Sequence, residues 1–306
     1  MLLFYSINYN QTKMQDKKIL WHLLAIITVI FWGTSFVSTK VLLNHGFSAI
    51  LVFFIRFVFT YILLVALSHK QLWANNLKDE LALLICGITG GTLYFWLENN
   101  ALLLSPTSNV SLIVCTNPIL ILITVSIFFS KERLSLRQTI GSILTFLGMI
   151  LVVLNGHFNL HLSPKGDFMA LGAAIVWVIY SICIRKINDQ YPTLFITRKI
   201  FFYSVITTLP LIAQDLSEIP WDAFSNSIVI LNFLLLTIFS SLFGYVIWNI
   251  VLKKLGTILA SNYIFFIPLV TMITAVIALN ETITLYAIIG AAAIIIGMIL
   301  AEYKKE

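Results

Sequence analysis

Ten apolar segments, each about twenty residues long, constrain this chain more than any other feature of its sequence. A helix needs about 20 mostly apolar residues to cross the hydrocarbon core of a bilayer. None of the segments alternates polar and apolar residues as the strands of a membrane barrel do. The sequence therefore predicts an all-α membrane protein with ten transmembrane helices, at residues 19–43, 47–67, 81–104, 107–129, 136–154, 166–184, 192–213, 227–250, 257–279 and 284–301.

The composition agrees with a chain that lies in a lipid bilayer. Hydrophobic residues make up 59% of the chain and charged residues only 10%, whereas roughly 25% of the residues of a soluble domain are charged. The net charge is +6, but the basic residues form short clusters between apolar segments and no stripe that could follow a phosphate backbone. We therefore expect the lipid bilayer, and not a nucleic acid, to be the partner of this surface.

The distribution of Lys and Arg predicts the orientation of the ten helices. With the N-terminus inside, two of the 19 basic residues fall in outer segments (Lys40 and Lys165) and three within spans (Arg56, Arg198 and Lys199). The other fourteen fall in inner segments, and cytoplasmic loops of membrane proteins carry such an excess. Both chain ends are therefore predicted to be cytoplasmic, in the cell (inner) membrane. These inner residues are Lys13, Lys17, Lys18, Lys70, Lys78, Lys131, Arg133, Arg137, Arg185, Lys186, Lys253, Lys254, Lys304 and Lys305.

The chain contains an internal repeat. The pattern of Glu132, Gly141 and Gly148 returns 150 residues later as Glu281, Gly290 and Gly297. The same shift superposes Asn99 on Asn249, Thr107 on Thr257, Ser111 on Ser261 and Pro118 on Pro268, and a shift of 145 superposes Trp32 on Trp177 and Lys40 on Arg185. Because five spans separate the two copies, they are predicted to face opposite sides of the membrane. Inverted repeats of this kind are common in secondary transporters.

The repeat divides the chain into five parts. Residues 1–18 are predicted to form a disordered cytoplasmic tail, and residues 19–154 the first five-helix half. Residues 155–165 form an extracytoplasmic linker, residues 166–301 the second half, and residues 302–306 a cytoplasmic C-terminal tail.

The order of these motifs resembles the ten-helix EamA-type transporters of the drug/metabolite transporter superfamily. The likeness lies in "FWGTSFVSTK" in the first span, "FFIRF" in the second, "LGAAIVWVIYSICIRK" in the sixth, and the two copies of a Pro–Glu–Gly–Gly block that begin "TNPILIL" and "FIPLVTM". The resemblance implies that spans one to four and six to nine line the transport path, with spans five and ten at the periphery. It also implies transport of amino acids, other metabolites or drugs, mostly outward.

Charged residues within the spans are candidates for the transport path. Glu98 is well inside span three, Arg56 lies in span two, and Lys40 is near the outer end of span one. Charges at membrane depth are usually paired and mark a pathway by default. Three roles are open for Glu98: a structural ion pair with Arg56 or Lys40, proton coupling, or contact with a substrate amine. Arg56 is interpreted as structural.

Two prolines occupy matching positions near the middle of spans four and nine. Pro118 and Pro268 each remove a backbone donor at membrane depth, and interruptions at matching positions of two halves point to the substrate site. The alternative is a kink that only improves packing. In spans two and seven the halves differ, because the second has Arg198 and Lys199 where the first has only Arg56.

Aromatic and amide side chains complete the predicted substrate site. Trp32 and Trp177 lie near the membrane midplane, where anchoring at the lipid interface is not expected, so they either form the cavity wall or pack between helices. The asparagines either face an aqueous cavity or bond between helices. The remaining candidates are Ser35, Tyr94, Asn99, Asn117, Tyr180, Tyr245, Asn249 and Asn262.

Other functional classes find little support in the sequence. No G-x-x-x-x-G-K-[ST] phosphate cradle occurs, which argues against ATP hydrolysis, and no motif calls for a cofactor or metal. The predicted function is that of a secondary transporter, not an enzyme. It exports a small organic solute by alternating access, with proton coupling open. Import or exchange of the same solutes is the alternative, and a membrane-embedded enzyme or structural subunit is the alternative of another class. Glycine faces on spans five and ten leave a monomer or a homodimer open.

Overall fold

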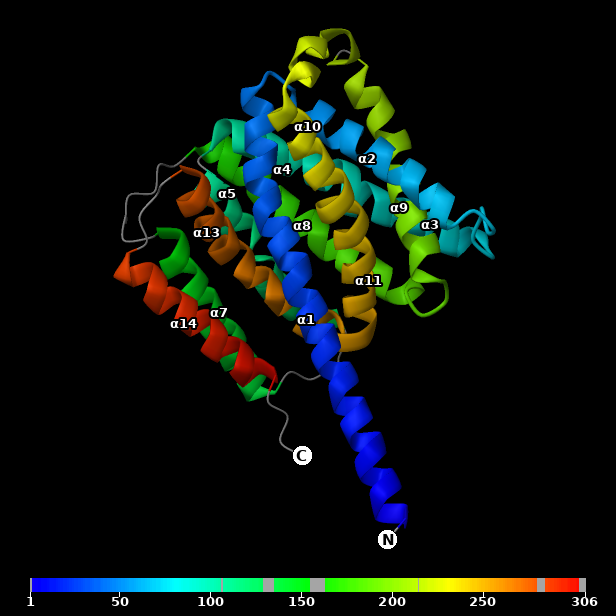
Figure 1. The fold of residues 1–306 in the computed structure, drawn as a ribbon, viewed down its shortest axis with the longest axis vertical. Helices are drawn as coiled ribbons and strands as arrows, with labels where there is room; N and C mark the ends of the chain where they lie inside the picture. Colours follow the sequence, from blue (N-terminus) through cyan, green and yellow to red (C-terminus); the bar gives the residue numbers. More distant parts are fainter. Residues whose placement is uncertain are drawn as a thin grey trace.

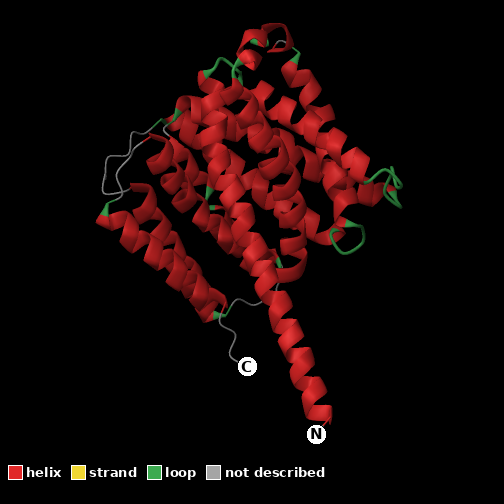
Figure 2. Ribbon diagram, viewed as in Figure 1, coloured by secondary structure: helices red, strands yellow, loops and turns green. Residues whose placement is uncertain are grey.

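All regular structure in the described part of the chain is helical. The computed structural model describes residues 2–105, 107–128, 135–154, 163–213, 215–279 and 284–302. Figure 2 shows these residues as helices joined by short loops, with no strand among them. Nine of their helical segments are long and apolar enough to cross a membrane, and Leu285–Ala301 is a shorter apolar helix. The prediction of a ten-helix membrane protein is thereby confirmed.

In the first half, spans three and four are each built from more than one helical piece. A π-helical turn at Ile88–Thr92 joins α3 and α4, and a turn at residues 115–116 separates α5 from α6. The helices are α1 (Leu2–Asn44), α2 (Ala49–Leu67), α3 (Leu77–Gly87), α4 (Leu93–Leu104), α5 (Thr107–Val114), α6 (Asn117–Phe128) and α7 (Leu136–Leu154).

The second half repeats these interruptions in spans eight and nine. A π-helical stretch at Leu235–Phe243 joins α10 to α11, and a 3₁₀ turn at Tyr263–Phe266 joins α12 to α13. The helices are α8 (Pro164–Ile187), α9 (Thr193–Ile212), α10 (Ser227–Leu234), α11 (Gly244–Leu255), α12 (Thr257–Asn262), α13 (Ile267–Leu279) and α14 (Leu285–Glu302). Short 3₁₀ turns at Asp215–Glu218 and Trp221–Ser225 lie between α9 and α10.

The N-terminal segment differs from its prediction. Helix α1 begins at Leu2, so residues 2–18 continue the first span as a helix and do not form a disordered tail. Figure 1 shows this end of α1 projecting from the bundle. We call the face from which it projects, which also carries the 68–76 and 188–192 loops, the N-terminal face. Most of the linker at 155–165 and most of the tail at 302–306 lie outside the described residues, as do Glu132 and Glu281.

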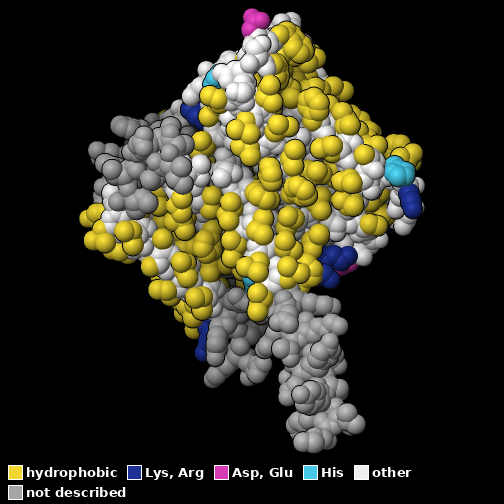
Figure 3. All heavy atoms as spheres, in the orientation of Figure 1, with side chains coloured by type: hydrophobic (Ala, Val, Ile, Leu, Met, Phe, Trp, Pro, Cys, Tyr) yellow, Lys and Arg dark blue, Asp and Glu magenta, His cyan; other side chains and the backbone are white. Residues whose placement is uncertain are grey.

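The surface of the bundle suits a lipid environment. Figure 3 shows hydrophobic side chains over most of the visible face, with charged side chains around its rim. Large exposed apolar residues occur along helices of both halves, among them Phe59, Ile62, Ile175 and Leu231. Such side chains favour hydrocarbon over water, so the helices and not the loops form the lipid-facing surface.

The helices of the two halves pack in reciprocal pairs. The first span of one half lies against the third and fourth spans of the other: α1 contacts α11 and α13, and α8 contacts α4 and α6. The second spans, α2 and α9, contact each other, and the fifth spans, α7 and α14, contact each other at the edge of the bundle (Figure 1). This exchange of partners is the pattern expected from a two-fold relation between the halves.

Spans five and ten show that the relation is an inversion. A Cβ atom added to Gly141 would lie 2.6 Å from the carbonyl of Gly297, and one added to Gly148 would lie 2.6 Å from the carbonyl of Gly290. The earlier glycine of one helix thus meets the later glycine of the other, so α7 and α14 run antiparallel, side by side in Figure 1. These glycine faces are therefore occupied within one chain and give no support to a homodimer.

We expect this close approach to make α7 and α14 intolerant of any side chain. Gly148→Ala places its methyl group against the α14 backbone, which cannot move as a side chain can, and should lower the stability by about 1–3 kcal/mol. Gly172→Ala is the matched control, because its methyl group would meet only the Leu97 side chain, at 3.2 Å. Thermal unfolding of the purified variants in detergent checks this. Equal melting temperatures for the two would contradict it.

Candidate functional site

A cavity lies between the two halves at the centre of the bundle. It is lined by spans one to four of the first half and by spans six, eight and nine of the second. No lining residue comes from α7 or α14, the fifth spans, nor from α9. The lining residues are Trp32, Ser35, Phe36, Arg56, Tyr94, Phe95, Glu98, Val114, Asn117, Trp177, Ser240, Tyr245, Ile264 and Ile267.

The breaks in spans four and nine position two matching pairs of these residues. Val114 and Asn117 flank the turn between α5 and α6, and Ile264 and Ile267, each 150 residues further on, flank the equivalent break. The irregular turns of both spans therefore border the cavity. Irregular backbone at membrane depth is tolerated where it borders such a cavity.

Pro118 and Pro268 act differently from the prediction. Each is the second residue of its helix, α6 or α13, where a missing N–H costs no helical hydrogen bond. Neither lines the cavity. The residues that precede them, Asn117 and Ile267, line it instead. The sequence indicated the depth of the interruption correctly but not which residues face the solute.

Aromatic rings from both halves form one wall. The ring centroids of Trp32 and Trp177 lie 5.5 Å apart, edge to face, and that of Tyr94 lies 5.0 Å from Trp177. Trp248 packs behind Trp32 at 4.9 Å, and Tyr180 packs behind Trp177 at 4.9 Å. The two midplane tryptophans therefore line the cavity and also pack against each other, so the cavity-wall and the packing interpretations both apply.

The π-helical turns hold two of the rings that line the cavity, those of Trp32 and Tyr245. In such a turn the backbone bonds shift by one residue, which leaves carbonyls free for other donors. The Ser240 carbonyl accepts the indole N–H of Trp32 at 3.1 Å, and the Gly90 carbonyl accepts the Tyr245 hydroxyl at 2.5 Å. Gly90 and Ser240 are 150 residues apart, so both halves use the same device, and nothing in the residue types had indicated it.

Two charged groups line the cavity without pairing with each other. Glu98, 7% exposed, accepts the Tyr94 hydroxyl at 2.7 Å. Arg56, 2% exposed, donates its Nε to the Ser241 hydroxyl at 2.9 Å and lies over the Phe95 ring at 4.5 Å. Lys40 lies away from the cavity and donates to the Leu102 carbonyl at 3.2 Å. Among the described residues no ion pair joins Glu98 to either cation, so the structural pair considered for it does not form.

Three buried polar atoms of the lining lack a hydrogen-bond partner within the described part of the chain. They are the Asn117 Oδ1, the Trp177 Nε1 and the Ser240 Oγ atoms. These residues are 2%, 4% and 2% exposed. A buried polar group without a partner costs free energy, so a solute that supplies the missing partners would be stabilised here.

The other predicted polar residues are held by bonds between helices. Asn99 donates to the Ala49 carbonyl at 3.0 Å, and Asn249 joins the hydroxyls of Tyr180, at 2.8 Å, and Thr197, at 3.0 Å. Asn262 accepts from Ser142 at 3.2 Å. Of the four asparagines, only Asn117 lines the cavity. The lining residues that the sequence did not single out are Phe36, Phe95, Val114, Ser240, Ile264 and Ile267, and apart from the 150-residue shift they carry no distinguishing signal.

Comparison with known proteins assigns this architecture to a family. The model of the EamA-like transporter family matches residues 19–154 and again residues 164–303. The chain belongs to this family, which is part of the drug/metabolite transporter superfamily. It is therefore a membrane transporter built from two copies of the EamA unit.

Relatives over nearly the whole chain agree with this. An uncharacterized transporter of Archaeoglobus fulgidus is 25% identical, over 93% of this chain and 99% of that protein. A protein of Salmonella typhimurium named as a probable amino-acid metabolite efflux pump is 26% identical, over 90% and 92%. One of Streptantibioticus cattleyicolor named as a probable terminal-alkyne amino-acid exporter is 23% identical, over 95% of both. A solved crystal structure shares the fold, with a TM-score of 0.71 at 18% identity, over 92% of this chain and 96% of its own.

The contrast between Asn249 and Asn117 gives a test of these assignments. Asn249→Ala removes the acceptor of the buried Tyr180 hydroxyl and the amide donor to Thr197, which keeps its bond to the Thr193 carbonyl, and should cost about 1–3 kcal/mol of stability. Asn117→Ala removes an amide oxygen that already lacks a partner and should change the stability much less. Thermal unfolding in detergent measures both. A larger loss for Asn117→Ala than for Asn249→Ala would contradict the assignment.

Proposed function

We propose that this protein is a secondary transporter that exports a small organic solute, an amino acid or a related metabolite, by alternating access at the central cavity. The observation that carries the proposal is the place of the cavity: it lies where the two inverted halves meet and takes its lining from both. A site at the interface of inverted repeats can open to either side as one half rocks against the other.

The chemistry of the lining supports an amphipathic solute. Trp32, Tyr94, Trp177 and Tyr245 offer a largely apolar wall, while Glu98 and Arg56 offer opposite charges. Pockets for small molecules combine an apolar lining with a few placed polar groups in this way. A neutral amino acid with an apolar side chain presents a matching set of groups.

Export is favoured by two of the relatives described above, which are named as an efflux pump and an exporter of amino acids or their metabolites. The excess of Lys and Arg in the predicted inner segments supports a cytoplasmic N-terminal face in the cell membrane. Import or exchange would use the same cavity and differ only in the gradients that drive it. Family membership and the names of the relatives favour a transporter over an enzyme.

Proton coupling is a further part of the proposal, and Glu98 is its candidate. Among the described residues it is the one carboxyl group that lines the cavity. A carboxyl group that alternates between the two faces with the solute can carry a proton in the opposite direction to the solute. Arg56 would then bind the solute or modulate the charge of Glu98, whereas Lys40, bonded to the Leu102 carbonyl, is assigned a structural role.

Flux of radiolabelled neutral amino acids into and out of proteoliposomes tests the proposal. Trp177→Ala should reduce flux at low substrate concentration at least about tenfold, since roughly 1.4 kcal/mol of lost contact weakens binding tenfold. Glu98→Gln should remove the response of flux to a pH gradient. Trp96→Ala is the matched control, because Trp96 lies on the exposed side of α4 and outside the cavity. Unchanged flux and pH response in both cavity variants would contradict the proposed site.

A further inference from the structure

The repeat exposes an asymmetry in the cavity. Asn117 in the first half corresponds to Ile267 in the second, and both line the cavity. Glu98 corresponds in the same way to Trp248, which is fully buried behind the Trp32 ring. At both positions the first half carries the polar group and the second half carries an apolar one.

Arg56 is also without a charged equivalent in the lining. Counted from the residues that precede the helices, Ser48 before α2 and Pro192 before α9, Arg56 corresponds to Ile200. Lys199 and Arg198 come one and two positions before Ile200 in that register, so they point to other sides of their helix, and neither lines the cavity. The likeness of "FFIRF" to "FITRKIFF" therefore does not place these cations at equivalent sites.

The second half contributes a mostly apolar surface. Its lining residues are Trp177, Ser240, Tyr245, Ile264 and Ile267. The Tyr245 hydroxyl is used by the Gly90 carbonyl. The Ser240 hydroxyl and the Trp177 indole N–H are then the free polar atoms of this wall, both uncharged.

We propose that the cavity binds an amino acid in one fixed orientation, with its charged head group on the first half and its apolar side chain on the second. Glu98 and the Asn117 Oδ1 accept hydrogen bonds from the ammonium, and Arg56 pairs with the carboxylate. Tyr245, Ile264 and Ile267 contact the side chain. A zwitterion supplies each unpaired charge of the cavity with its opposite, which neither an amine nor an acid alone can do. The proposal rests on the proposed function and adds which residues determine the specificity.

Probes that each lack one group test this orientation. Binding to the purified protein is measured by quenching of tryptophan fluorescence, with L-leucine, 3-methylbutylamine, 4-methylpentanoate and glycine. L-leucine should bind at least about tenfold more tightly than each of the others, the loss expected when a hydrogen bond to a charged group or a buried side chain is missing. Glu98→Gln should weaken leucine and the amine but not the acid, and Arg56→Met should weaken leucine and the acid but not the amine.

Exchange of the repeat-related residues provides the matched variants. Asn117→Ile should weaken leucine and glycine about equally, whereas Ile267→Asn should reduce the preference for leucine over glycine. Equal effects on all four probes, or no binding of leucine, would overturn the inference. Saturable transport of a solute that lacks one of the two charges would overturn it too, while leaving the proposed function intact.

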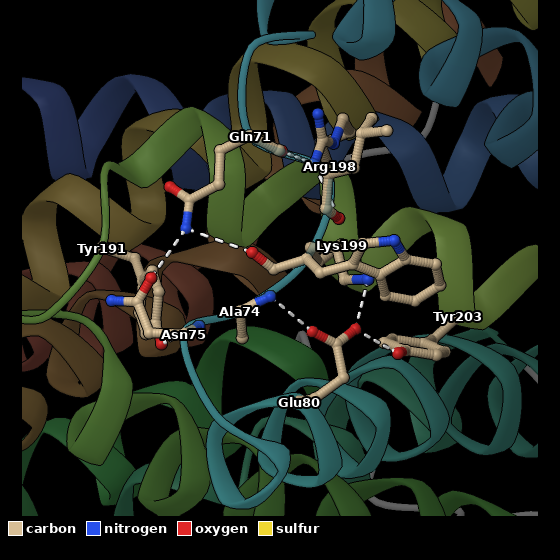
Figure 4. A network of polar contacts seen from close by, with 10 residues as sticks. Gln71, Ala74, Asn75, Glu80, Tyr191, Arg198, Lys199 and Tyr203 are labelled. Carbon is tan, nitrogen blue, oxygen red and sulfur yellow. Dashed lines mark hydrogen bonds and ion pairs between the residues drawn. The ribbon is translucent and has the colours of Figure 1, made fainter.

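A second, independent observation concerns the N-terminal face. Figure 4 shows a network that joins the start of α9, in the second half, to residues 68–80 of the first half. The Arg198 guanidinium donates to the carbonyls of Ser68, Gln71 and Leu72. Lys199, only 2% exposed, forms an ion pair with Glu80.

The network is satisfied by its own members. Glu80 also accepts the Tyr203 hydroxyl and, at 2.7 Å, the Ala74 N–H. Lys199 lies 4.2 Å from the centre of the Trp73 ring. Tyr191 donates to Asp79 at 2.7 Å and accepts the Asn75 N–H at 2.9 Å. Within the described part of the chain, no buried side-chain polar atom of this cluster lacks a partner, so a structural closure fits it better than a binding site.

The opposite face is closed by weaker contacts at the equivalent position. Hydrogen bonds join the halves there, from Ser48 to Asp215 at 2.5 Å, between Asn226 and His45 at 3.4 Å, and from Ser105 to Asp167 at 2.8 Å. Beside Ser48, the Phe47 ring lies 5.2 Å from Phe224 and 5.0 Å from Phe233. Among the described residues no ion pair joins the halves at this face.

The geometry points to an ionic latch, formed by Glu80, Arg198, Lys199 and Tyr203, that holds the N-terminal face closed. This rests on the proposed alternating access. Removing one partner of a buried ion pair leaves an unpaired charge and is strongly unfavourable. The latch therefore biases the free protein toward a closed N-terminal face, and the cavity opens to this side only when these bonds separate.

Labelling of a cysteine in the cavity tests the latch. Ser35→Cys is reacted with a membrane-impermeant thiol reagent added from the N-terminal face, without any solute. Glu80→Gln and Lys199→Met should each speed labelling about tenfold by shifting the population toward the open face, and the double variant should be no faster than the singles. Lys253→Met is the control, because Lys253 pairs with Asp189 at 3.6 Å on the same face but within the second half.

Labelling rates that stay at the parent value in Glu80→Gln, or that rise equally in Lys253→Met, would overturn the latch. Glu80→Gln keeps the shape of the side chain, so the test does not depend on whether Lys199→Met folds. Because labelling is read without solute, loss of the latch and failure of transport are separate outcomes.

Discussion

The structure depends on one constraint: the hydrocarbon of a bilayer offers no hydrogen-bond partners, so every backbone group released from a helix must be satisfied by the protein. The two π-helical turns meet that demand with side chains of other helices. The carbonyls freed in the two π-helical turns accept Tyr245 and Trp32. The breaks in spans four and nine border a cavity. The irregular backbone therefore both shapes the site and fixes the rings that line it.

The two-fold relation between the halves explains why the cavity is central. Because α1 packs on α11 and α13 while α8 packs on α4 and α6, each half supplies walls to the other. The α7–α14 pair, joined by backbone contact at its glycines, contributes no lining residue and can act as a peripheral support. Symmetry sets the framework, and differences between repeat-related side chains give the cavity its polarity.

The sequence predicted the architecture well because its signals are periodic and collective. The length of the apolar segments predicted the spans. The 150-residue shift predicted the inverted relation of the halves, which the contact between Gly141 and Gly297 confirms. Trp32, Trp177, Glu98 and Asn117 line the cavity, since polar and large aromatic residues stand out at membrane depth, and their part in substrate binding stays a prediction.

Side-chain partners could not be predicted in the same way. Asn99, Asn249 and Asn262 have the same side chain as Asn117, yet all three bond between helices. Which of the four faces the cavity depends on helix rotation, to within a fraction of a turn, and residue type does not report it. The role of the two prolines could not be predicted for a similar reason. A proline in the first turn of a helix has the same sequence pattern as one that kinks the middle of a span.

The central claim is that the two inverted halves move against each other around a shared cavity. The most direct measurement is the distance between spin labels on the two halves, at Lys78 and Gln190 on the N-terminal face and at Asn44 and Asp222 on the opposite face, with and without a transported solute. All four residues are exposed. The account predicts that one distance lengthens as the other shortens. Both distances moving in the same sense, or neither moving while flux continues, would contradict it.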